Sequence, residues 1–157
     1  MVRTVKTKQN LGMVDISQKE KTKRVAVACG HIKMSPKAFK ALLSQQSPKG
    51  DVLETAKIAG IMAAKSTPAI IPMCHPLELN KVKLSFEKDK KFHSIQIQSE
   101  VVCVGRTGVE MEALTAVCAA ALTIYDRMKW ADKAMVISDI KLLSKSGGKS
   151  GDFLRTS

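Results

Sequence analysis

Regular alternation of hydrophobic and polar residues predicts four strands along the chain. In the first of them, Val25, Val27 and Cys29 occupy every second position. A period of two residues is typical of a strand with one buried face. The charged run KDKK between the second and third segments is typical of a hairpin turn. The same pattern along the chain predicts strands over 24–34, 81–87, 93–104 and 135–143.

Two helices are predicted between the first two strands. Ser35 followed by Pro36 is a typical start for a helix over 35–46, because serine caps the first turn and proline fits the first helical position. Asp51 and Glu54 are three residues apart, which is a capping-box pattern with aspartate as the cap. The small-residue segment that follows predicts a second helix over 50–65.

A third, longer helix is predicted after residue 106. Thr107 and Glu110 form another capping-box pattern, and we expect the helix to run for about 24 residues, to near Ala131. Apolar residues recur at steps of three and four and predict a buried stripe. The residues of this stripe are Leu114, Val117, Cys118, Ala121, Leu122, Tyr125 and Met128.

The order strand, helix, helix, strand, strand, helix, strand is a split βαβ arrangement with one extra helix. We therefore predict an α+β fold in which helices cover one face of an antiparallel four-stranded sheet. Residues 1–12 are expected to form a flexible basic arm, and residues 13–157 a single domain. The N-terminus lacks the apolar core of a secretory leader, and no CxxC pair is present, which favours a cytoplasmic protein with reduced thiols.

The net charge narrows the range of partners. The chain has 26 basic and 14 acidic residues, a net charge of +12. Such an excess suits an anionic partner, which can be a nucleic acid, a phosphorylated metabolite or a membrane surface, but it also occurs on surfaces that serve only solubility. The longest apolar run, AVCAAALTI, is too short to cross a bilayer.

Three sequence features are candidates for chemistry, each with a structural alternative. At 100° per residue, Lys129 falls within the apolar stripe of the long helix and Asp126 at its edge, so they form either a structural ion pair or an acid/base couple tuned by partial burial. Cys74 and His75 lie between two prolines and suggest a metal site, a thiol–imidazole nucleophile or a rigid rim that holds a ligand.

The glycine-rich tail SKSGGKSGDF is the third feature. It is not a P-loop, because Leu143 stands where the first glycine is required and no helix can follow. Its backbone N–H groups, together with Lys145 and Lys149, suit phosphate oxygens. The alternative is a frayed terminus.

Four motifs in order along the chain resemble one known family. KGDVLETAKIAGIMAAK, IPMCHPL, GRTGVEMEALTAVCAAALTIYDRMK and LLSKSGGKSGDF are similar to the cyclic pyranopterin monophosphate synthases, the molybdenum cofactor biosynthesis protein C family. The resemblance covers roughly residues 13 to 153. It implies a ferredoxin-like lyase that converts 3′,8-cyclo-7,8-dihydro-GTP into cyclic pyranopterin monophosphate and releases pyrophosphate.

The resemblance also implies roles for individual residues and an assembly. Asp126, Lys129 and Lys49 match the family's catalytic positions. The enzyme is expected to be a hexamer, a trimer of dimers with active sites at subunit interfaces, and to meet the preceding radical enzyme transiently. No resident cofactor, metal, nucleic-acid or membrane partner is implied, and Mg²⁺ accompanying the triphosphate is left open. The implied substrate-binding residues are Met73, Cys74, His75, Met111, Glu112, Lys145 and Arg24.

Two other classes of function stay open at this point. A nucleic-acid-binding module of the same fold would explain the charge, but it needs aromatic residues on the central strands, where only Phe86 is present. A thiol-dependent or metal-dependent enzyme would use Cys74 and His75 directly.

Overall fold

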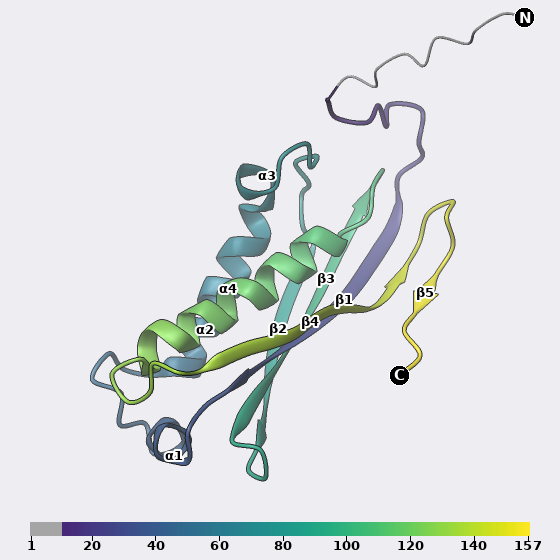
Figure 1. Ribbon diagram of the computed structural model, residues 1–157. Helices are drawn as coiled ribbons and strands as arrows, with labels where there is room; N and C mark the ends of the chain where they lie inside the picture. Colours follow the sequence, from purple (N-terminus) through teal and green to yellow (C-terminus); the bar gives the residue numbers. More distant parts are fainter. Residues whose placement is uncertain (1–10) are drawn as a thin grey trace, which may run out of the picture.

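One antiparallel sheet forms the base of the structure, a computed structural model that describes residues 11–157 (Figure 1). The strand order is β2-β3-β1-β4-β5, and every neighbouring pair is antiparallel. The first four strands in this order have the arrangement of a split βαβ fold, which confirms the predicted fold class. The strands are β1 (Thr22–Lys33), β2 (Lys81–Asp89), β3 (Ser94–Gly105), β4 (Val136–Ser146) and β5 (Phe153–Leu154).

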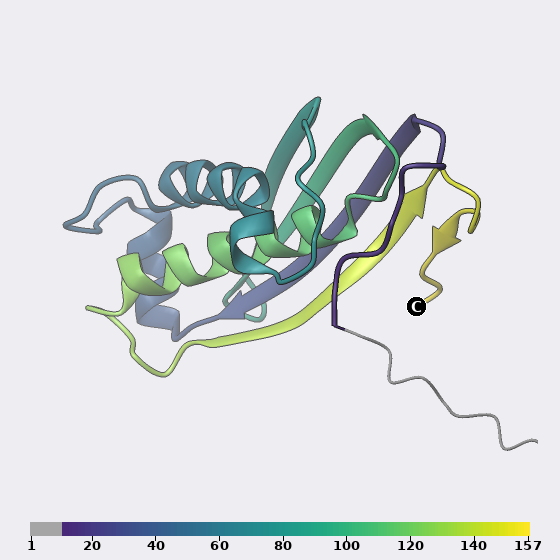
Figure 2. The ribbon, with the colours of Figure 1, turned by 90° about the horizontal axis from the view of Figure 1, so that it is seen from above.

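Helices α2 and α4 lie side by side over the same face of this sheet (Figure 2). Both predicted caps of the first two helices are confirmed. The Ser35 hydroxyl accepts a hydrogen bond from the Ala38 N–H at 3.2 Å, and the Asp51 carboxylate accepts one from the Glu54 N–H at 3.0 Å. The helices are α1 (Pro36–Leu43), α2 (Val52–Lys65), α3 (Thr67–Ile70) and α4 (Glu110–Met128).

The number of strands and the start of helix α4 differ from the prediction. The sheet has five strands instead of four, because the glycine-rich tail turns back and pairs Phe153 with Lys145. Helix α4 has 19 residues and begins after Val109, without a side-chain cap, so the capping box assigned to Thr107 and Glu110 is wrong. The physical reason is that Val109 occupies the cap position, so Glu110 is the first helical residue and not the third, and its carboxylate pairs with the Lys145 ammonium group at 3.2 Å.

The buried stripe of α4 is rotated from the predicted one. Leu122 is 62% exposed, whereas Ala116 and Ala120 are fully buried. Small residues of α4 face the core because α4, α2 and the sheet approach one another closely. A Cβ atom added at Gly60 of α2 would lie 2.4 Å from a methyl group of Leu84 and 3.0 Å from the Ala116 carbonyl oxygen of α4. The buried residues of α4 are Glu112, Ala113, Ala116, Val117, Ala120, Ala121, Ile124 and Met128.

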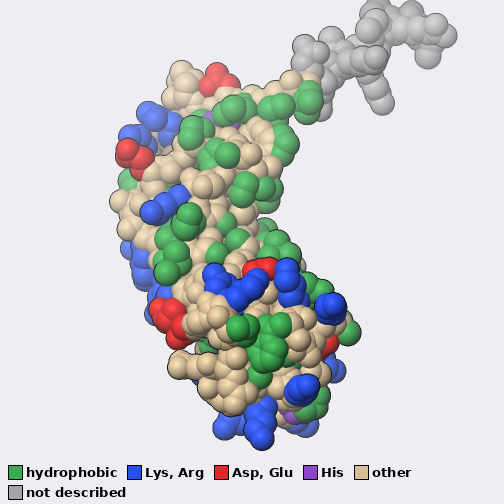
Figure 3. Space-filling view, turned by 90° about the vertical axis from the view of Figure 1, so that its left-hand side faces the viewer, with side chains coloured by type: hydrophobic (Ala, Val, Ile, Leu, Met, Phe, Trp, Pro, Cys, Tyr) green, Lys and Arg blue, Asp and Glu red, His purple; other side chains and the backbone are tan. Residues whose placement is uncertain are grey.

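Some of the exposed side chains of α2 and α4 are also apolar. Besides Leu122, two apolar residues of α2, Ile58 and Met62, are more than half exposed. Figure 3 shows hydrophobic side chains along the side of the molecule that lies on the left of Figure 1. None of the helices within residues 11–157 combines the length and the apolar character that a bilayer crossing requires.

Candidate active site

A pocket of about 320 Å³ lies where the segment before β2 meets the first turn of α4. Five of the residues that the resemblance implies for substrate binding line it together. Three of them come from one loop and two from the helix, which are separated by strands β2 and β3 in the sequence. These five residues are Met73, Cys74, His75, Met111 and Glu112.

The loop of this pocket is held by its backbone conformation and by the N-terminal segment. Met73 has a left-handed backbone conformation, with φ 65°, between the stiff positions Pro72 and Pro76. The His75 ring donates a hydrogen bond from Nε2 to the Val14 carbonyl oxygen at 2.8 Å. Residues 12–16 therefore dock against the loop and add Gly12, Val14 and Ile16 to the pocket wall.

Glu112 is the buried acidic group of this pocket. Glu112 is only 3% exposed. Burial raises the pKa of its carboxyl, and the nearby Glu110 raises it further. Among the described residues it has no ion-pair partner. This carboxyl therefore keeps its proton to a higher pH than an ordinary glutamate, and the protonated form can donate a hydrogen bond as well as accept one.

The electrostatic environment of Cys74 favours the rim interpretation of the Cys74–His75 pair over a thiol nucleophile. Burial raises the pKa of the Cys74 thiol, and the neighbouring Glu112 acts in the same direction. An activated nucleophilic cysteine needs the opposite shift. Across residues 11–157, no group of three or more His, Cys, Asp and Glu side chains is arranged to hold a metal ion.

A second, cationic pocket of about 390 Å³ lies beside the first. Arg24 and Lys149 line it, and Lys19 lines both pockets. Lys145 connects them: its ammonium group lies 3.2 Å from the Glu110 carboxylate of the first pocket and 3.4 Å from the Ser150 hydroxyl of the second. A ligand with an uncharged base and an anionic tail fits this pair of pockets by charge.

The glycine-rich tail is built into the cationic pocket, so its interpretation as a frayed terminus is wrong. Gly148 has φ 89°, and a Cβ atom there would lie 1.8 Å from an Arg24 guanidinium nitrogen. Only glycine allows this turn and this contact together. Arg24 is itself buried, and its Nε donates to the Gly105 carbonyl oxygen at 3.3 Å.

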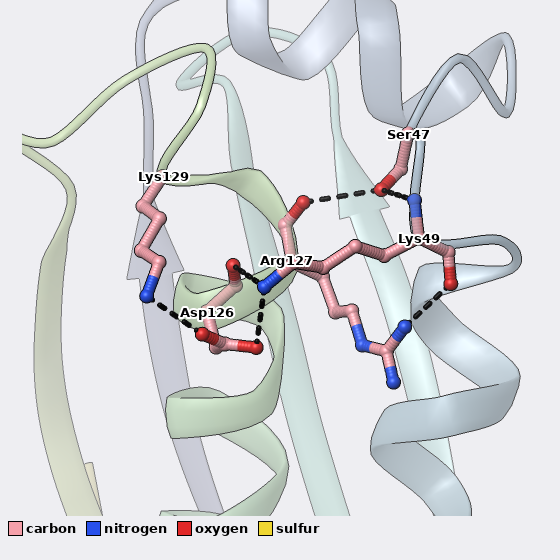
Figure 4. Close-up of polar contacts among 5 residues, drawn as sticks. All are labelled: Ser47, Lys49, Asp126, Arg127 and Lys129. Carbon is pink, nitrogen blue, oxygen red and sulfur yellow. Dashed lines mark hydrogen bonds and ion pairs between the residues drawn. The ribbon is translucent and has the colours of Figure 1, made fainter.

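A separate cluster lies at the other end of α4 (Figure 4). Each oxygen of the Asp126 carboxylate forms an ion pair with one lysine. Lys129 Nζ is 2.8 Å from Oδ1, and Lys49 Nζ is 3.1 Å from Oδ2. Hydrogen bonds from Lys129 and then Lys49 lower the pKa of Asp126, and the same bond to Asp126 raises the pKa of Lys129. The predicted pairing of Asp126 with Lys129 is confirmed.

The environment of this pair differs from the expected partial burial. The side chains of Asp126 and Lys129 are each about half exposed, at 49% and 50%. The backbone of Lys129 is still helical, and its N–H donates to the Tyr125 carbonyl oxygen at 2.9 Å. Lys129 lies off the apolar stripe because the buried face of α4 is rotated from the predicted one. Mutual pairing, and not burial, is therefore what shifts the pKa values of these two groups.

Within one chain the implied site residues thus form two groups. Glu112 and Asp126 are 14 residues apart on one helix, which is about 21 Å at a rise of 1.5 Å per residue. The four candidate lysines are divided in the same way, with Lys49 and Lys129 at one end of α4 and Lys145 and Lys149 at the other.

Several residues of these groups were not singled out from the sequence. Lys19 lines both pockets, and Glu110 holds Lys145, although Glu110 was noted only as a cap. Ser47 and Arg127 hydrogen-bond to the backbone around Lys49 and the end of α4. The only sequence signal for Arg127 was its position in the last turn of the helix, where a cation is favourable.

Comparison with known proteins identifies relatives over nearly the whole chain. Residues 13–148 match the model of the MoaC family. A cyclic pyranopterin monophosphate synthase from Desulfatibacillum aliphaticivorans is 56% identical over 147 residues, which cover 94% of this chain and 92% of that protein. Proteins of the same name from Magnetococcus marinus and Heliobacterium modesticaldum are 52% and 54% identical, each over 91% of this chain and 88% and 90% of their own lengths.

Proposed function

This chain belongs to the MoaC family, and we propose that it is a cyclic pyranopterin monophosphate synthase. It is a lyase of molybdenum cofactor biosynthesis that converts 3′,8-cyclo-7,8-dihydro-GTP into cyclic pyranopterin monophosphate and releases pyrophosphate. The reaction rearranges rings and replaces a phosphoanhydride bond of the triphosphate with an ester bond of the cyclic monophosphate, with pyrophosphate as the leaving group and no change of redox state. It therefore needs groups that move protons and groups that hold phosphates.

The observation that carries this proposal is the pairing of two adjoining pockets of different character. The first pocket offers a buried carboxyl, Glu112, and polar and sulfur-containing side chains for a heterocyclic base. The second offers Arg24 and Lys149, with Lys145 between the two. The substrate has the same division, a purine-derived ring system at one end and a triphosphate at the other.

We assign the proton transfers to the cluster of Asp126, Lys49 and Lys129. Its carboxylate is held ionised by two ammonium groups, so it is ready to accept a proton only after a lysine moves away. An anionic substrate that draws Lys49 or Lys129 toward itself has this effect, because the loss of a cation raises the pKa of Asp126. The cluster thus becomes basic when substrate is bound.

We further propose that a complete site combines the two groups from different chains, across the two-fold interface of a dimer. This assignment is supported by the separation of about 21 Å between Glu112 and Asp126 in one chain. It is also supported by the exposed apolar side chains of α2 and α4, including Ile58, Met62 and Leu122, which a partner chain would cover. The hexamer, a trimer of such dimers, is part of this proposal.

The remaining features of the proposal concern location, partners and ions. Four cysteines, all with free thiols, support a cytoplasmic location, where transient contact with the preceding radical enzyme is expected. Mg²⁺ would reach the site bound to the triphosphate and not to dedicated protein ligands. A nucleic-acid-binding role finds little support, because Phe86, the aromatic residue of the central strands, is partly buried and packs against the core.

The test is incubation of the purified protein with 3′,8-cyclo-7,8-dihydro-GTP. We expect stoichiometric release of pyrophosphate, together with a product that yields a fluorescent pterin on oxidation. Activity that persists after chelation of metals and in Cys74→Ser would exclude the thiol-dependent and metal-dependent alternatives. Absence of both products, with a folded protein and authentic substrate, would contradict the proposed function.

A further inference from the structure

Lys49 is the member of the Asp126 cluster that does not lie on or next to α4. It belongs to the loop of residues 44–51 that joins α1 to α2, and it lies two residues before Asp51, the cap of α2. Loops of this kind are mobile unless side chains hold them. The distance of 3.1 Å between Lys49 Nζ and Asp126 Oδ2 therefore requires that the loop be fixed to the end of α4.

We propose that Arg127 and Ser47 are positioning residues that fix the Lys49 backbone to the end of α4 and so hold the Lys49 ammonium group against Asp126. The proposal rests on the proposed function insofar as Lys49 acts in catalysis. It concerns two residues that touch the Lys49 backbone and the last turn of α4, not the predicted substrate pockets.

Two side chains form the connection, one from each segment (Figure 4). The Arg127 guanidinium group donates a hydrogen bond to the Lys49 carbonyl oxygen. The Ser47 hydroxyl donates to the Arg127 carbonyl oxygen at 3.1 Å and accepts from the Lys49 N–H at 3.3 Å. The N–H and the carbonyl group of Lys49 are thus both bound, one on each side of its Cα atom.

The same contacts complete the C-terminus of α4. The last four carbonyl groups of a helix have no partner within it. In α4, the Arg127 carbonyl is satisfied by Ser47, and the Asp126 carbonyl lies 3.5 Å from Lys49 Nζ. The loop therefore acts as the helix cap, and the free energy of capping contributes to holding Lys49 in place.

The alternative role for Arg127 is a favourable cation at a helix C-terminus, which would need no particular partner. Among the described residues, however, Arg127 has no carboxylate partner, and its guanidinium group is directed to one carbonyl. Ser47 is buried, at 8% exposed, although its hydroxyl serves only this connection. Both observations indicate a specific contact to the Lys49 backbone.

The test compares Arg127→Met with the wild-type protein in two assays. The first is pyrophosphate release from the cyclised nucleotide, where we expect kcat to fall on the order of 10- to 100-fold with a much smaller change in KM, as a displacement of about 1 Å does at other sites. The second is labelling with an amine-reactive reagent, read by peptide mass spectrometry. Here we expect labelling of Lys49 to rise relative to Lys129, which shares the partner Asp126 but lies next to it on the helix.

Three further variants make the result specific. Arg127→Lys keeps a donor and should recover part of both effects. Ser47→Ala removes the second contact without touching Arg127, so it tests the proposal even where Arg127→Met does not fold. Ser44→Ala is the matched control for Ser47→Ala, since Ser44 lies in the same loop and its hydroxyl also donates to a backbone carbonyl, that of Lys40 at 2.6 Å, which belongs to α1 and not to α4. It should leave both assays unchanged.

Wild-type kcat and an unchanged labelling ratio in Arg127→Met would overturn the proposal. A uniform rise in the labelling of all lysines would also overturn it, because that outcome shows general loosening and not displacement of Lys49. If the wild-type protein itself released no pyrophosphate, the proposed function would fail, while the labelling ratio would still decide whether Arg127 holds Lys49.

Discussion

The two ends of helix α4 each carry a carboxyl group, and the surroundings of these two groups shift their pKa values in opposite directions. Glu112, near the first turn, is buried at 3% exposure, and burial raises the pKa of its carboxyl. Asp126, in the last turn, is half exposed, and two lysines lower its pKa. The first group therefore keeps its proton to a higher pH than an ordinary glutamate, and the second is an ionised carboxylate held by cations.

Oppositely shifted carboxyl groups are a common way to separate acid and base roles in one active site. Here the separation is spatial as well, since about 21 Å of helix lies between them. The Glu112 end has the pockets that suit base and phosphates, and the Asp126 end has the groups that suit proton transfer. Neither end alone has both functions, which is the reason to expect two chains in each site.

The largest effect is expected at the Asp126 end. Asp126→Asn should lower kcat by about 10²- to 10⁴-fold, the usual contribution of a general acid or base. Thermal unfolding should be nearly unchanged, because a negative charge at a helix C-terminus opposes the dipole and exposed ion pairs contribute little. Both are measured on the same preparation, by pyrophosphate release and by calorimetry.

A matched control is available on α2. Glu54 and Lys57 form an exposed ion pair with the same i,i+3 spacing, at 2.7 Å, and Glu54→Gln should leave turnover intact. An Asp126→Asn protein that turns over normally, or that unfolds at a much lower temperature than Glu54→Gln, would show that Asp126 is structural. The proposed contrast between the ends of α4 would then be lost.

Mixing of inactive chains tests whether the two ends meet in one site. Glu112→Ala and Asp126→Ala chains are dissociated, combined and reassembled. Random pairing makes about half of the dimers mixed, and each mixed dimer has one intact site of two, so activity should return to roughly a quarter of wild type. No recovery, with subunit exchange confirmed by mass spectrometry, would place both residues in one chain's own site or remove Glu112 from the mechanism.

The sequence predicted those features that depend on neighbouring residues. Ser35 and Asp51 cap their helices as expected, because each needs only the N–H group three residues later. The same local pattern failed at Thr107. Val109 occupies the cap position there, so Glu110 is the first helical residue, and its carboxylate pairs with Lys145, a residue 35 positions away that no local rule includes. The two-residue strand β5 was missed since it is too short to show a period.

The resemblance identified the site residues as one set and did not divide them into two groups. The resemblance indicated Lys49, Asp126 and Glu112 together, and only the length of α4 indicated that two of them are far apart. The contact between Lys49 and Asp126 joins residues 77 positions apart, and it depends on how the loop before α2 docks on α4. Periodicity has no information about such docking, so the role of Arg127 appears only in the structure.

At the Glu112 end, Lys145→Ala should weaken binding of the triphosphate substrate about tenfold, the loss expected for one charge-assisted hydrogen bond. Removal of Lys145 also leaves the Glu110 carboxylate without its partner, which adds repulsion toward phosphates. Binding of a pterin product without pyrophosphate should change much less. Calorimetric titration with both ligands measures the difference, and Lys141→Ala on the same strand is the control. Equal losses for the two ligands would contradict a phosphate role.

The smallest effect concerns the stability of the Glu112 end as a function of pH. A carboxyl whose pKa is raised in the folded state binds more protons there than in the unfolded chain. The stability that its neutral form contributes is fully present below the ordinary pKa of glutamate and is lost as the pH rises through the raised folded pKa. Glu112→Gln removes this titration and keeps the shape of the side chain.

We therefore expect Glu112→Gln and wild type to unfold at similar temperatures in mild acid and to diverge as the pH rises. The variant should become the more stable by roughly 1 kcal/mol, because the wild-type protein then holds a buried charge without an ion-pair partner. Thermal unfolding measured from mildly acidic to mildly alkaline pH tests this, with the exposed Glu54→Gln as control. A constant difference across that range would mean that Glu112 titrates as an ordinary glutamate, and the two carboxyl groups of α4 would then differ only in the lysines around Asp126.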